Sequence, residues 1–457
     1  MNNIAHHPAS FKDPSGFVFQ KNNIFYRQIN QTYKDDYDLL MSSGLYDELI
    51  NKKYLLSHQE INENFTGSAE RYKTILPEQL SFISYPYEWC FGQLKDAALL
   101  TLSIQKTAIA HGMILKDAAH FNVQFHNGKP VFIDTLSFEK YDSSQPWVAY
   151  RQFCECFLFP LYLQRYLRIN VQKLMLTYPE GIPASITKEL LPWKSNFNLG
   201  VGLHVSLQST IKTGNNSGDY KGEFDQKKML NLVNNLEESI KGCTIKKHTT
   251  TWSTYYDETI ISQSYLSEKE TIFLKLISLI EFKKVLDIGA NDGFFSKVIS
   301  EKATSVVSVD FDSHCINNLY AYTKKQKASN ILPLCIDFSN PTPAIGFNNT
   351  ERSSFLDRAQ FDVLLGLALV HHLAISKNIP LQNIAESFQK IAKTVIVEFI
   401  SKEDEKVQQL LQHRKDIFSN YNEVEFIKAF SKYFNMISTT NIPGTHRIMY
   451  LLSRKEN

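Results

Sequence analysis

Three aspartates accompany three consecutive predicted strands in the C-terminal half of the sequence. Asp287, Asp310 and Asp337 each stand at or next to the carboxyl end of a short apolar run, so a parallel sheet would gather them at one edge. Asp310 follows Asp287 by 23 residues, the separation at which an acidic side chain can accept hydrogen bonds from both hydroxyls of a ribose. Such a set of carboxylates suits a cationic, phosphate-free nucleoside and suits a pyrophosphate poorly.

The turn after the first of these strands allows a backbone to approach a ligand closely. In the string VLDIGANDGFF, Gly289, Asn291 and Gly293 lie between the strand and a helical segment whose N-terminus offers free N–H groups. Asn291 stands where the G-x-G-x-x-G pattern of dinucleotide-binding turns has its second glycine, which weakens a dinucleotide interpretation. Asparagine still tolerates the left-handed backbone. S-adenosylmethionine (SAM) fits these carboxylates and this turn better.

Two adjacent histidines follow the fourth predicted strand, in the string FDVLLGLALVHHL. His371 and His372 are candidate bases, because a histidine with a pKa of about 6.5 can take a proton from a hydroxyl as a methyl group is transferred. The alternative is that one of them only caps or packs the turn, since methyl transfer needs mainly positioning and desolvation. Trp252, Tyr255 and Tyr256 precede this region and either cover the site or pack in the core.

A second set of polar residues, in the N-terminal half, has the spacing found in phosphoryl-transfer enzymes. Asp117 and Asn122 reproduce a D-x-x-x-x-N pattern, and Asp134 follows across a predicted hairpin that makes it a neighbour of Asn122. In that chemistry Asp117 would orient the acceptor hydroxyl, while Asn122 and Asp134 would hold Mg²⁺ on the phosphates of ATP. The alternatives are that Asp117 and Asn122 only cap turns, or that the site binds a ligand without catalysis.

Five apolar runs predict the element that positions the first set of residues. Each run is separated from the next by a helical segment or a crossover loop, which predicts a parallel sheet with helices on both faces. The runs cover residues 285–288, 306–309, 331–336, 363–367 and 395–399.

Two hairpins and a long helix are the strongest signals of the N-terminal half. The turn Lys21-Asn22-Asn23 and the pair Asn127-Gly128 each stand between β-rich runs. Residues 90–112 predict a helix with Gly112 just past its end, and residues 72–76 and 80–86 predict two further strands. Residues 147–210 predict helices that prolines interrupt.

The sequence predicts two domains joined by a linker. No aliphatic residue occurs from Lys212 to Glu223, which is typical of a linker or an exposed loop. We therefore expect an α+β domain with a helical extension over residues 16–210, a linker over 211–225, and an α/β, doubly wound domain over 226–457.

Residues 250–455 resemble a class I (Rossmann-like) SAM-dependent methyltransferase. VLDIGANDGFF is similar to the first motif of that family, Asp310 to its ribose-binding acid, Asp337 to the residue beside the adenine, and FDVLLGLALVHHL to the fourth-strand motif. The resemblance implies that residues 434–454 form an antiparallel hairpin that closes the sheet. It also implies four residues at the methionine and ribose end of the cofactor, namely Asp287, Gly289, Asn291 and Gly293.

Residues 16–165 resemble a protein-kinase-like or aminoglycoside-phosphotransferase-like fold. The three polar residues described above carry this resemblance, together with the long helix that precedes them. The sequence departs from the family because Leu115-Lys116 precedes Asp117, Thr135-Leu136 follows Asp134, and the first hairpin lacks a glycine-rich loop. The basic residue that would bind ATP is left open among Arg27, Lys53 and Lys73.

Composition gives little reason to expect a polymeric or membrane partner. Hydrophobic residues make up 43% of the chain, enough for more than one core, and 49 Lys and Arg against 47 Asp and Glu give a net charge of +2. The bulk charge therefore demands neither nucleic acid nor an anionic membrane, although a local patch stays possible. Residues 153–163, the most apolar window, are too short to span a membrane and predict a core helix.

Six scattered cysteines and a polar N-terminus indicate a cytoplasmic protein. The cysteines form no C-x-x-C pair and are interpreted as reduced core thiols, and the first residues have neither a cationic nor an apolar leader region.

The leading functional hypothesis is a SAM-dependent methyltransferase. The whole chain also resembles bacterial nodulation-type or polysaccharide-associated methyltransferases, which implies a glycan, glycolipid or other hydroxylated small-molecule acceptor. The alternatives are a phosphotransferase that uses ATP and Mg²⁺ through the N-terminal residues, and a non-catalytic ligand-binding protein.

Overall fold

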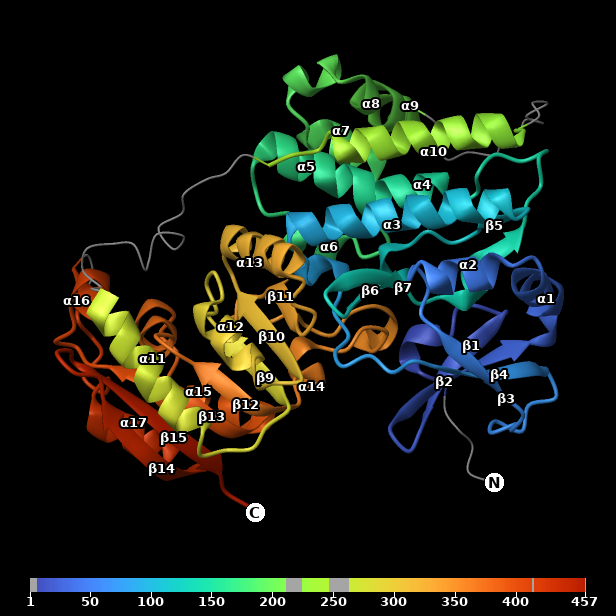
Figure 1. Cartoon of the computed structure of the whole chain (residues 1–457). Coiled ribbons are helices and arrows are strands. Elements are labelled where there is room, and N and C mark those ends of the chain that lie inside the picture. Colours follow the sequence, from blue (N-terminus) through green and yellow to red (C-terminus); the bar gives the residue numbers. More distant parts are fainter. Residues whose placement is uncertain (1–5, 211–223, 246–262, 413–414, 457) are drawn as a thin grey trace. The chain divides into compact units, whose positions relative to one another are not determined.

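The computed structural model describes residues 6–210, 224–245, 263–412 and 415–456, and the chain divides into two compact units (Figure 1). The first unit comprises Met1–Lys247 together with Ala344–Arg352, and the second comprises His248–Pro343 with Ser353–Asn457. Most of the predicted linker, and the aromatic residues Trp252, Tyr255 and Tyr256, lie outside the described residues.

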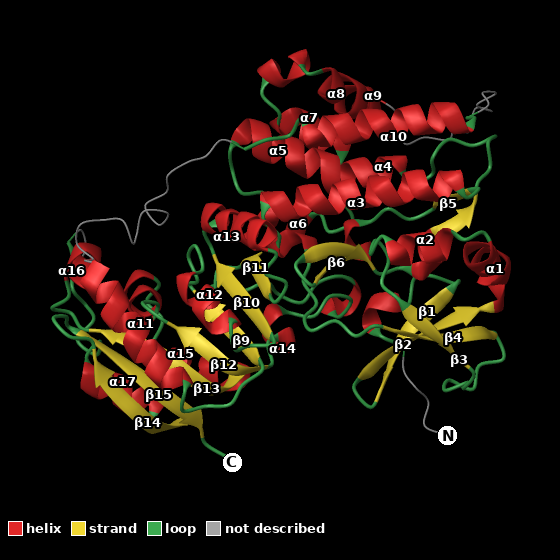
Figure 2. Cartoon of the chain, viewed as in Figure 1, coloured by secondary structure: helices red, strands yellow, loops and turns green. Residues whose placement is uncertain are grey.

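The second unit is built on a seven-stranded sheet in the order β11-β10-β9-β12-β13-β15-β14 (Figure 2). The strands from β9 to β13 pair in parallel, and β15 pairs antiparallel with both β13 and β14. The five predicted parallel strands and the closing antiparallel hairpin are therefore confirmed. Their bounds are β9 Lys284–Ile288, β10 Ser305–Asp310, β11 Ile331–Cys335, β12 Phe361–Gly366, β13 Ala392–Ile400, β14 Phe434–Asn441 and β15 Arg447–Arg454.

Helices of this unit pack through apolar stripes that the sequence spacing dictates. In α15, the residues at positions 381, 384, 385, 388 and 391 are apolar and buried, which is the three- and four-residue repeat of an amphipathic helix. The helices are α11 Gln263–Ile277, α12 Phe294–Ser300, α13 Ser313–Gln326, α14 Phe355–Arg358, α15 Leu381–Ile391, α16 Glu405–Leu411 and α17 Glu423–Phe430.

The first unit contains an antiparallel sheet in the order β1-β2-β4-β3, accompanied by two short helices. Asn22 and Asn23 both adopt positive φ in the predicted turn between β1 and β2, as a tight hairpin requires. Gly44 separates the two helices with a φ of 81°. The bounds are β1 Gly16–Lys21, β2 Ile24–Asn30, α1 Lys34–Ser42, α2 Leu45–Asn51, β3 His58–Ile61 and β4 Arg71–Pro77.

The remainder of the first unit is mainly helical. The predicted helix is α3, Phe91–Ala110, and Gly112 follows it with a φ of 72°. The predicted Asn127-Gly128 hairpin joins β6 Val123–His126 to β7 Lys129–Phe132. The other elements are β5 Met113–Leu115, β8 Phe138–Lys140, α4 Tyr150–Phe153, a π-helix Cys154–Leu158, α5 Phe159–Leu167, α6 Gln172–Thr177, α7 Ala184–Leu190, α8 Leu199–Val201, a second π-helix Gly202–Ser206, α9 Leu207–Thr210 and α10 Gln226–Lys241.

The predicted strand over residues 80–86 does not form. Ser84 in this segment is tied to a side chain, because its N–H donates to Gln124 Oε1 (2.9 Å) and its carbonyl accepts from Gln124 Nε2 (2.8 Å). The polar side chain thus satisfies the backbone that a neighbouring strand would otherwise pair. The fourth strand of the sheet is instead β3, which was not predicted.

The boundary between the two units differs from the predicted linker, because α10 belongs to the first unit. It packs along α3, and an ion pair joins Lys106 to Glu237. Lys95 also donates to the carbonyls of Lys241 and Cys243, at 2.9 and 2.8 Å. Residues 344–352 join the first unit as well, where Glu351 Oε1 lies 2.8 Å from Lys12 Nζ.

The most apolar window of the sequence is part of the core, as predicted. Residues 153–163 form the end of α4, the π-helix and the start of α5, and nearly all of their side chains are buried. Across the described ranges, no helix has the length and apolar character needed to cross a bilayer.

Candidate cofactor site

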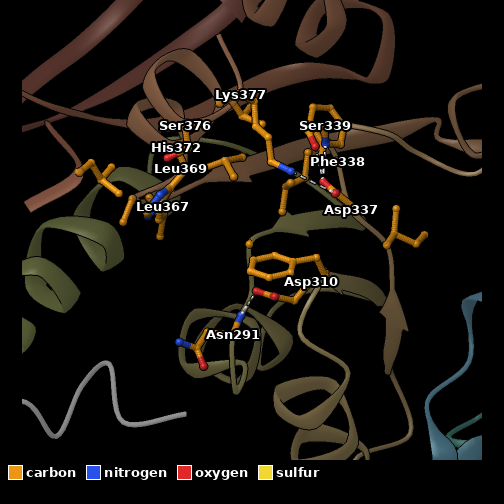
Figure 3. Close-up of a pocket in the computed structure, with 17 residues that line it drawn as sticks. Asn291, Asp310, Asp337, Phe338, Ser339, Leu367, Leu369, His372, Ser376 and Lys377 are labelled. Atoms are coloured by element: carbon orange, nitrogen blue, oxygen red, sulfur yellow. Dashed lines mark hydrogen bonds and ion pairs between the residues drawn. The ribbon is translucent and has the colours of Figure 1, made fainter. Parts of the chain in front are cut away.

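A cavity opens at the carboxyl ends of β9, β10, β11 and β12, where the sheet geometry gathers the loops that follow the strands (Figure 3). It measures about 270 Å³. The polar and aromatic residues that line it are Asn291, Asp310, Phe311, Asp337, Phe338, Ser339, His372, Ser376 and Lys377, and the apolar wall includes Leu367, Leu369 and Leu373.

The turn after β9 forms one wall of the cavity with its backbone. Gly289 has a φ of 74°, and its N–H donates to the carbonyl of Val309 (2.9 Å). Asn291 has a φ of 52°, so it adopts the left-handed conformation expected of it. Gly289 and Asn291 line the cavity, whereas Gly293 does not. Gly293 begins α12 and lies so close to Leu319 that a Cβ atom would come within 2.5 Å of that side chain.

Asp310 ends β10 with its carboxylate at the cavity, pointing toward the β9 turn (Figure 3). Its Oδ2 accepts a hydrogen bond from the backbone N–H of Asn291 (2.9 Å), and its Oδ1 accepts from the N–H of Asp312 (2.8 Å). The backbone N–H of Phe311 also bonds to this carboxylate. Because a carboxylate has about four acceptor sites, it can still accept from a further donor. Burial raises the pKa of Asp310 to about 6, against the effect of these hydrogen bonds.

Asp287 differs from its predicted place, because it lies beneath the cavity and does not line it. Its Oδ2 accepts a hydrogen bond from Ser296 Oγ (2.6 Å), and Ser308 Oγ lies 2.7 Å from the same hydroxyl. Burial, with the nearby Asp310 as a lesser cause, raises the pKa of Asp287 to about 6. Asp287 therefore joins β9 to α12 through Ser296, next to the site.

Asp337 lines the cavity opposite the β9 turn. Its Oδ1 accepts from the N–H and the hydroxyl of Ser339, at 2.9 and 2.5 Å, and its Oδ2 lies 3.5 Å from Lys377 Nζ. Burial alone would raise the pKa of Asp337, but these hydrogen bonds and Lys377 outweigh it and lower the pKa. The carboxylate is thus ionised at neutral pH.

His371 and His372 differ in whether they line the cavity. His372 lines the cavity, and burial lowers its pKa to about 4, so the imidazole is neutral at pH 7. His371 lies behind it, fully buried, with a ring centroid 4.0 Å from that of His372. Within the described part of the chain neither ring nitrogen of His371 has a hydrogen-bond partner, and burial lowers its pKa well below the ordinary value.

The sequence interpretation missed several lining residues. Phe311, which is 55% exposed, directly follows Asp310, and Phe338 directly follows Asp337. An aromatic residue next to each acid is a signal that could have been used, because a nucleobase stacks on such rings. Lys377 lies five residues past His372 in an irregular segment and carries no such signal.

The raised pKa of Asp310 predicts a pH dependence of SAM binding. A carboxyl with a pKa of about 6 is mostly ionised at pH 7.5 and mostly protonated at pH 5. Because the ionised form is the better acceptor for hydroxyl donors and attracts a cation, SAM affinity should fall roughly tenfold between these two values. Calorimetry at both values measures the effect, and the Asp310→Asn variant should lack most of it.

The three polar residues of the N-terminal half also converge. The β6–β7 hairpin makes Asn122 and Asp134 neighbours, and the N–H of Ile133 donates to the carbonyl of Asn122 (2.8 Å). Burial first and Asp134 second raise the pKa of Asp117, while hydrogen bonds from Asn122 and Gln152 lower it. The predicted proximity is therefore confirmed.

Local hydrogen bonds occupy two of these side chains. Asp117 Oδ1 accepts from the N–H of Ala119, and Asp134 Oδ1 accepts from the N–H of Leu136, each at 2.9 Å. Arg27, on β2, forms an ion pair with Asp134. Among the three basic residues left open, Arg27 is the one placed at this site, whereas Lys73 pairs with Glu60 at 2.6 Å.

The sheet order, the glycine turn and the cavity at the carboxyl ends of the strands define the second unit as a Rossmann-like α/β unit. The chain is 31% identical over 461 residues to nodulation protein NoeA of Rhizobium meliloti (strain 1021). This alignment covers 98% of this chain and 96% of NoeA. The chain therefore belongs to the family of nodulation protein NoeA. No family model matches it.

Solved structures with similarity to the chain include three methyltransferases. The match to N-methyltransferase NodS of Bradyrhizobium japonicum, in complex with S-adenosylhomocysteine, covers 45% of this chain and 100% of the NodS chain. The identity is 12% and the TM-score is 0.33. The match to a SAM-dependent methyltransferase of Clostridium acetobutylicum covers 45% of this chain and 98% of that enzyme, with 16% identity and a TM-score of 0.34. The match to the bifunctional kinase-methyltransferase WbdD covers 45% of this chain and 43% of WbdD, with 17% identity and a TM-score of 0.30.

Proposed function

We propose that the second unit binds SAM and transfers its methyl group to a hydroxylated acceptor, a glycan or a small molecule. The observation that carries the proposal is the Asp310 carboxylate, which backbone N–H groups hold at the cavity with acceptor capacity left for a further donor. A ribose presents two neighbouring hydroxyls that match this acceptor.

The other lining residues fit the remaining parts of the same ligand. Asp337 and Phe338 offer a hydrogen-bond acceptor and an aromatic face for the adenine. The backbone of Gly289 and Asn291 faces the methionine end, and Asp287 adds negative charge beneath it. SAM supplies an electrophilic methyl group on a sulfonium, so what these residues contribute is binding, orientation and exclusion of water.

His372 is the better placed of the two predicted bases, because it lines the cavity and His371 does not. With a pKa of about 4 its ring is a weak base at neutral pH. We therefore assign it the part of a hydrogen-bond acceptor that orients the hydroxyl of the acceptor, and we assign His371 to the support of that ring.

Isothermal calorimetry of the full chain with SAM, S-adenosylhomocysteine and NAD⁺ tests the proposal. SAM and S-adenosylhomocysteine should bind with one-to-one stoichiometry, while NAD⁺ should not bind, because the cavity places carboxylates where a pyrophosphate would lie. Binding of NAD⁺ in preference to SAM, or no binding of SAM at millimolar concentration, would contradict it.

A phosphotransferase activity of the first unit is the second candidate function. The convergence of Asp117, Asn122 and Asp134 favours it, because phosphoryl transfer needs an aspartate near the acceptor and an Asn–Asp pair for Mg²⁺. Arg27 would lie against the phosphates once Mg²⁺ takes its place beside Asp134. These residues would then bind and orient ATP, which supplies the phosphoryl group.

This candidate predicts that Mg·ATP at millimolar concentration raises the melting temperature of the chain, and that ATP without Mg²⁺ raises it less. Asp117→Asn should abolish phosphoryl transfer but leave SAM binding unchanged, since it lies in the other unit. If Mg·ATP gives no thermal shift, the three residues form a structural cluster around the β6–β7 hairpin and the phosphotransferase interpretation fails.

We also propose that the protein acts in the cytoplasm. All six cysteines are buried and none of them forms a disulfide, which suits a reducing compartment.

A further inference from the structure

Five large apolar side chains form an exposed surface on the helical part of the first unit. Leu199 is 91% exposed, Phe197 81% and Trp193 67%, and Leu190 and Leu203 are exposed as well. The rings of Trp193 and Phe197 touch edge to face, with centroids 5.8 Å apart. Exposed apolar residues that gather in this way mark an interaction site more often than isolated ones do. We call these five residues the apolar surface.

The opposite side of the same segment is firmly held, so the exposure is built into the fold. His204 is fully buried and bonds to Tyr150 OH and to Asn235 Oδ1, each at 2.7 Å. Val201 and Val205 are buried beside it. Gly200 brings the backbone of α8 so close to Tyr162 that a Cβ atom would lie 2.3 Å from the phenol oxygen. The helical periodicity that buries these residues turns Leu199 and Leu203 outward.

Two lysines and one acid stand in the chain beside the apolar surface, which gives this segment a small positive charge. Lys194 is the one charged side chain in the sequence from 190 to 211, since His204 is buried with a lowered pKa. Its Nζ lies 5.9 Å from the centre of the Trp193 ring. Lys188, on α7, is a second exposed cation nearby in the chain, and Glu189 is the one acid between them. An aromatic and aliphatic surface with lysines at its edge has the composition of segments that lie in a lipid headgroup region.

We propose that the apolar surface docks on an anionic lipid bilayer, with Trp193, Phe197 and Leu199 among the acyl chains and Lys188 and Lys194 at the headgroups. Figure 2 places α8 at the end of the first unit opposite its four-stranded sheet, so a flat partner reaches it without contacting that sheet. The proposal is independent of the proposed methyl transfer.

Sedimentation of the full chain with vesicles tests the proposal. The protein should pellet with vesicles of phosphatidylcholine and phosphatidylglycerol, and less with phosphatidylcholine alone. The triple variant Trp193→Ser, Phe197→Ser, Leu199→Ser should lower the partition coefficient roughly tenfold or more. Val424→Ser with Ile437→Ser, which removes two exposed apolar residues of the second unit (72% and 56% exposed), should leave the partition coefficient unchanged.

Three outcomes would overturn the proposal. The first is that the wild-type chain does not pellet with anionic vesicles. The second is that the triple variant still pellets while Lys188→Glu with Lys194→Glu does not, which means adsorption by charge alone. The third is a wild-type dimer in light scattering that the triple variant turns into a monomer, which means that a second copy covers the apolar surface. Circular dichroism of each variant verifies that it is folded.

Discussion

Replacing Asp310 with alanine should weaken SAM binding by about 1–3 kcal/mol, or roughly 5- to 150-fold in the dissociation constant. The variant removes the acceptor for both ribose hydroxyls and leaves the N–H groups of Asn291 and Asp312 without their partner. Both effects act on the same end of the ligand, because the Asn291 turn is one wall of the cavity. Calorimetry of the purified variant measures the loss.

Asp362 provides a matched control for the loss of the two backbone hydrogen bonds. It lies at the start of β12, at the opposite edge of the sheet, and its Oδ2 accepts from the N–H groups of Lys283 and Lys284, each at 2.9 Å. Asp362→Ala should therefore loosen the unit about as much as Asp310→Ala while SAM affinity stays the same. Equal losses in both variants would mean that general loosening weakens binding. An unchanged affinity in Asp310→Ala would refute the placement of the cofactor.

The sheet of the second unit could be predicted from sequence because its strands are buried on both faces. Such strands are continuous apolar runs, which differ clearly from the amphipathic helices between them. The first unit was harder, because its sheet is small and its strands mix polar and apolar residues. The β3 strand, HQEI, has no apolar run, while the apolar segment at residues 80–86 pairs with the Gln124 side chain and forms no strand.

The sequence located the edge of the sheet that holds the site but not the direction of each side chain there. Asp287 lies inside β9 and faces Ser296, whereas Asp310 is the last residue of β10 and faces the cavity. A shift of one residue along a strand reverses the face, so predictions that are accurate to within a residue or two cannot separate the two cases. The same uncertainty applies to His371 and His372, because His371 immediately precedes the π-helix His372–Ser376 that begins with the second histidine.

A buried network of charged residues escaped the sequence interpretation altogether. Glu398 is fully buried in β13, 2.6 Å from Lys269 Nζ, and it accepts a hydrogen bond from Tyr265 OH (3.0 Å). Arg447 lies 3.7 Å from the same carboxylate and pairs with Asp404 at 2.7 Å. These residues come from α11, β13, β15 and the start of α16, so no local spacing could have joined them. The network ties α11 to the antiparallel end of the sheet.

Glu398→Ala should be the most destabilising single substitution in the second unit. Burial alone would raise the pKa of Glu398, but Lys269 and Arg447 outweigh it and lower the pKa, so the carboxylate is ionised at neutral pH. Its removal leaves Lys269 as a buried cation without its counter-ion, which costs about 3–5 kcal/mol. Hydrogen exchange of the β13 and β15 amides measures the local free energy of opening without assuming that the two units unfold together.

Two further variants separate the charge effect from a simple loss of packing. Glu386→Ala breaks the exposed Glu386–Lys390 pair on α15 and should change the free energy of opening by about 0.5 kcal/mol or less. Lys269→Met combined with Glu398→Leu removes both charges and keeps the volume, so it should recover most of the loss. The double variant and Glu398→Ala differ chiefly in whether the Lys269 charge stays buried. If both are equally unstable, the uncompensated Lys269 charge does not account for the destabilisation, and the cause is cavity formation.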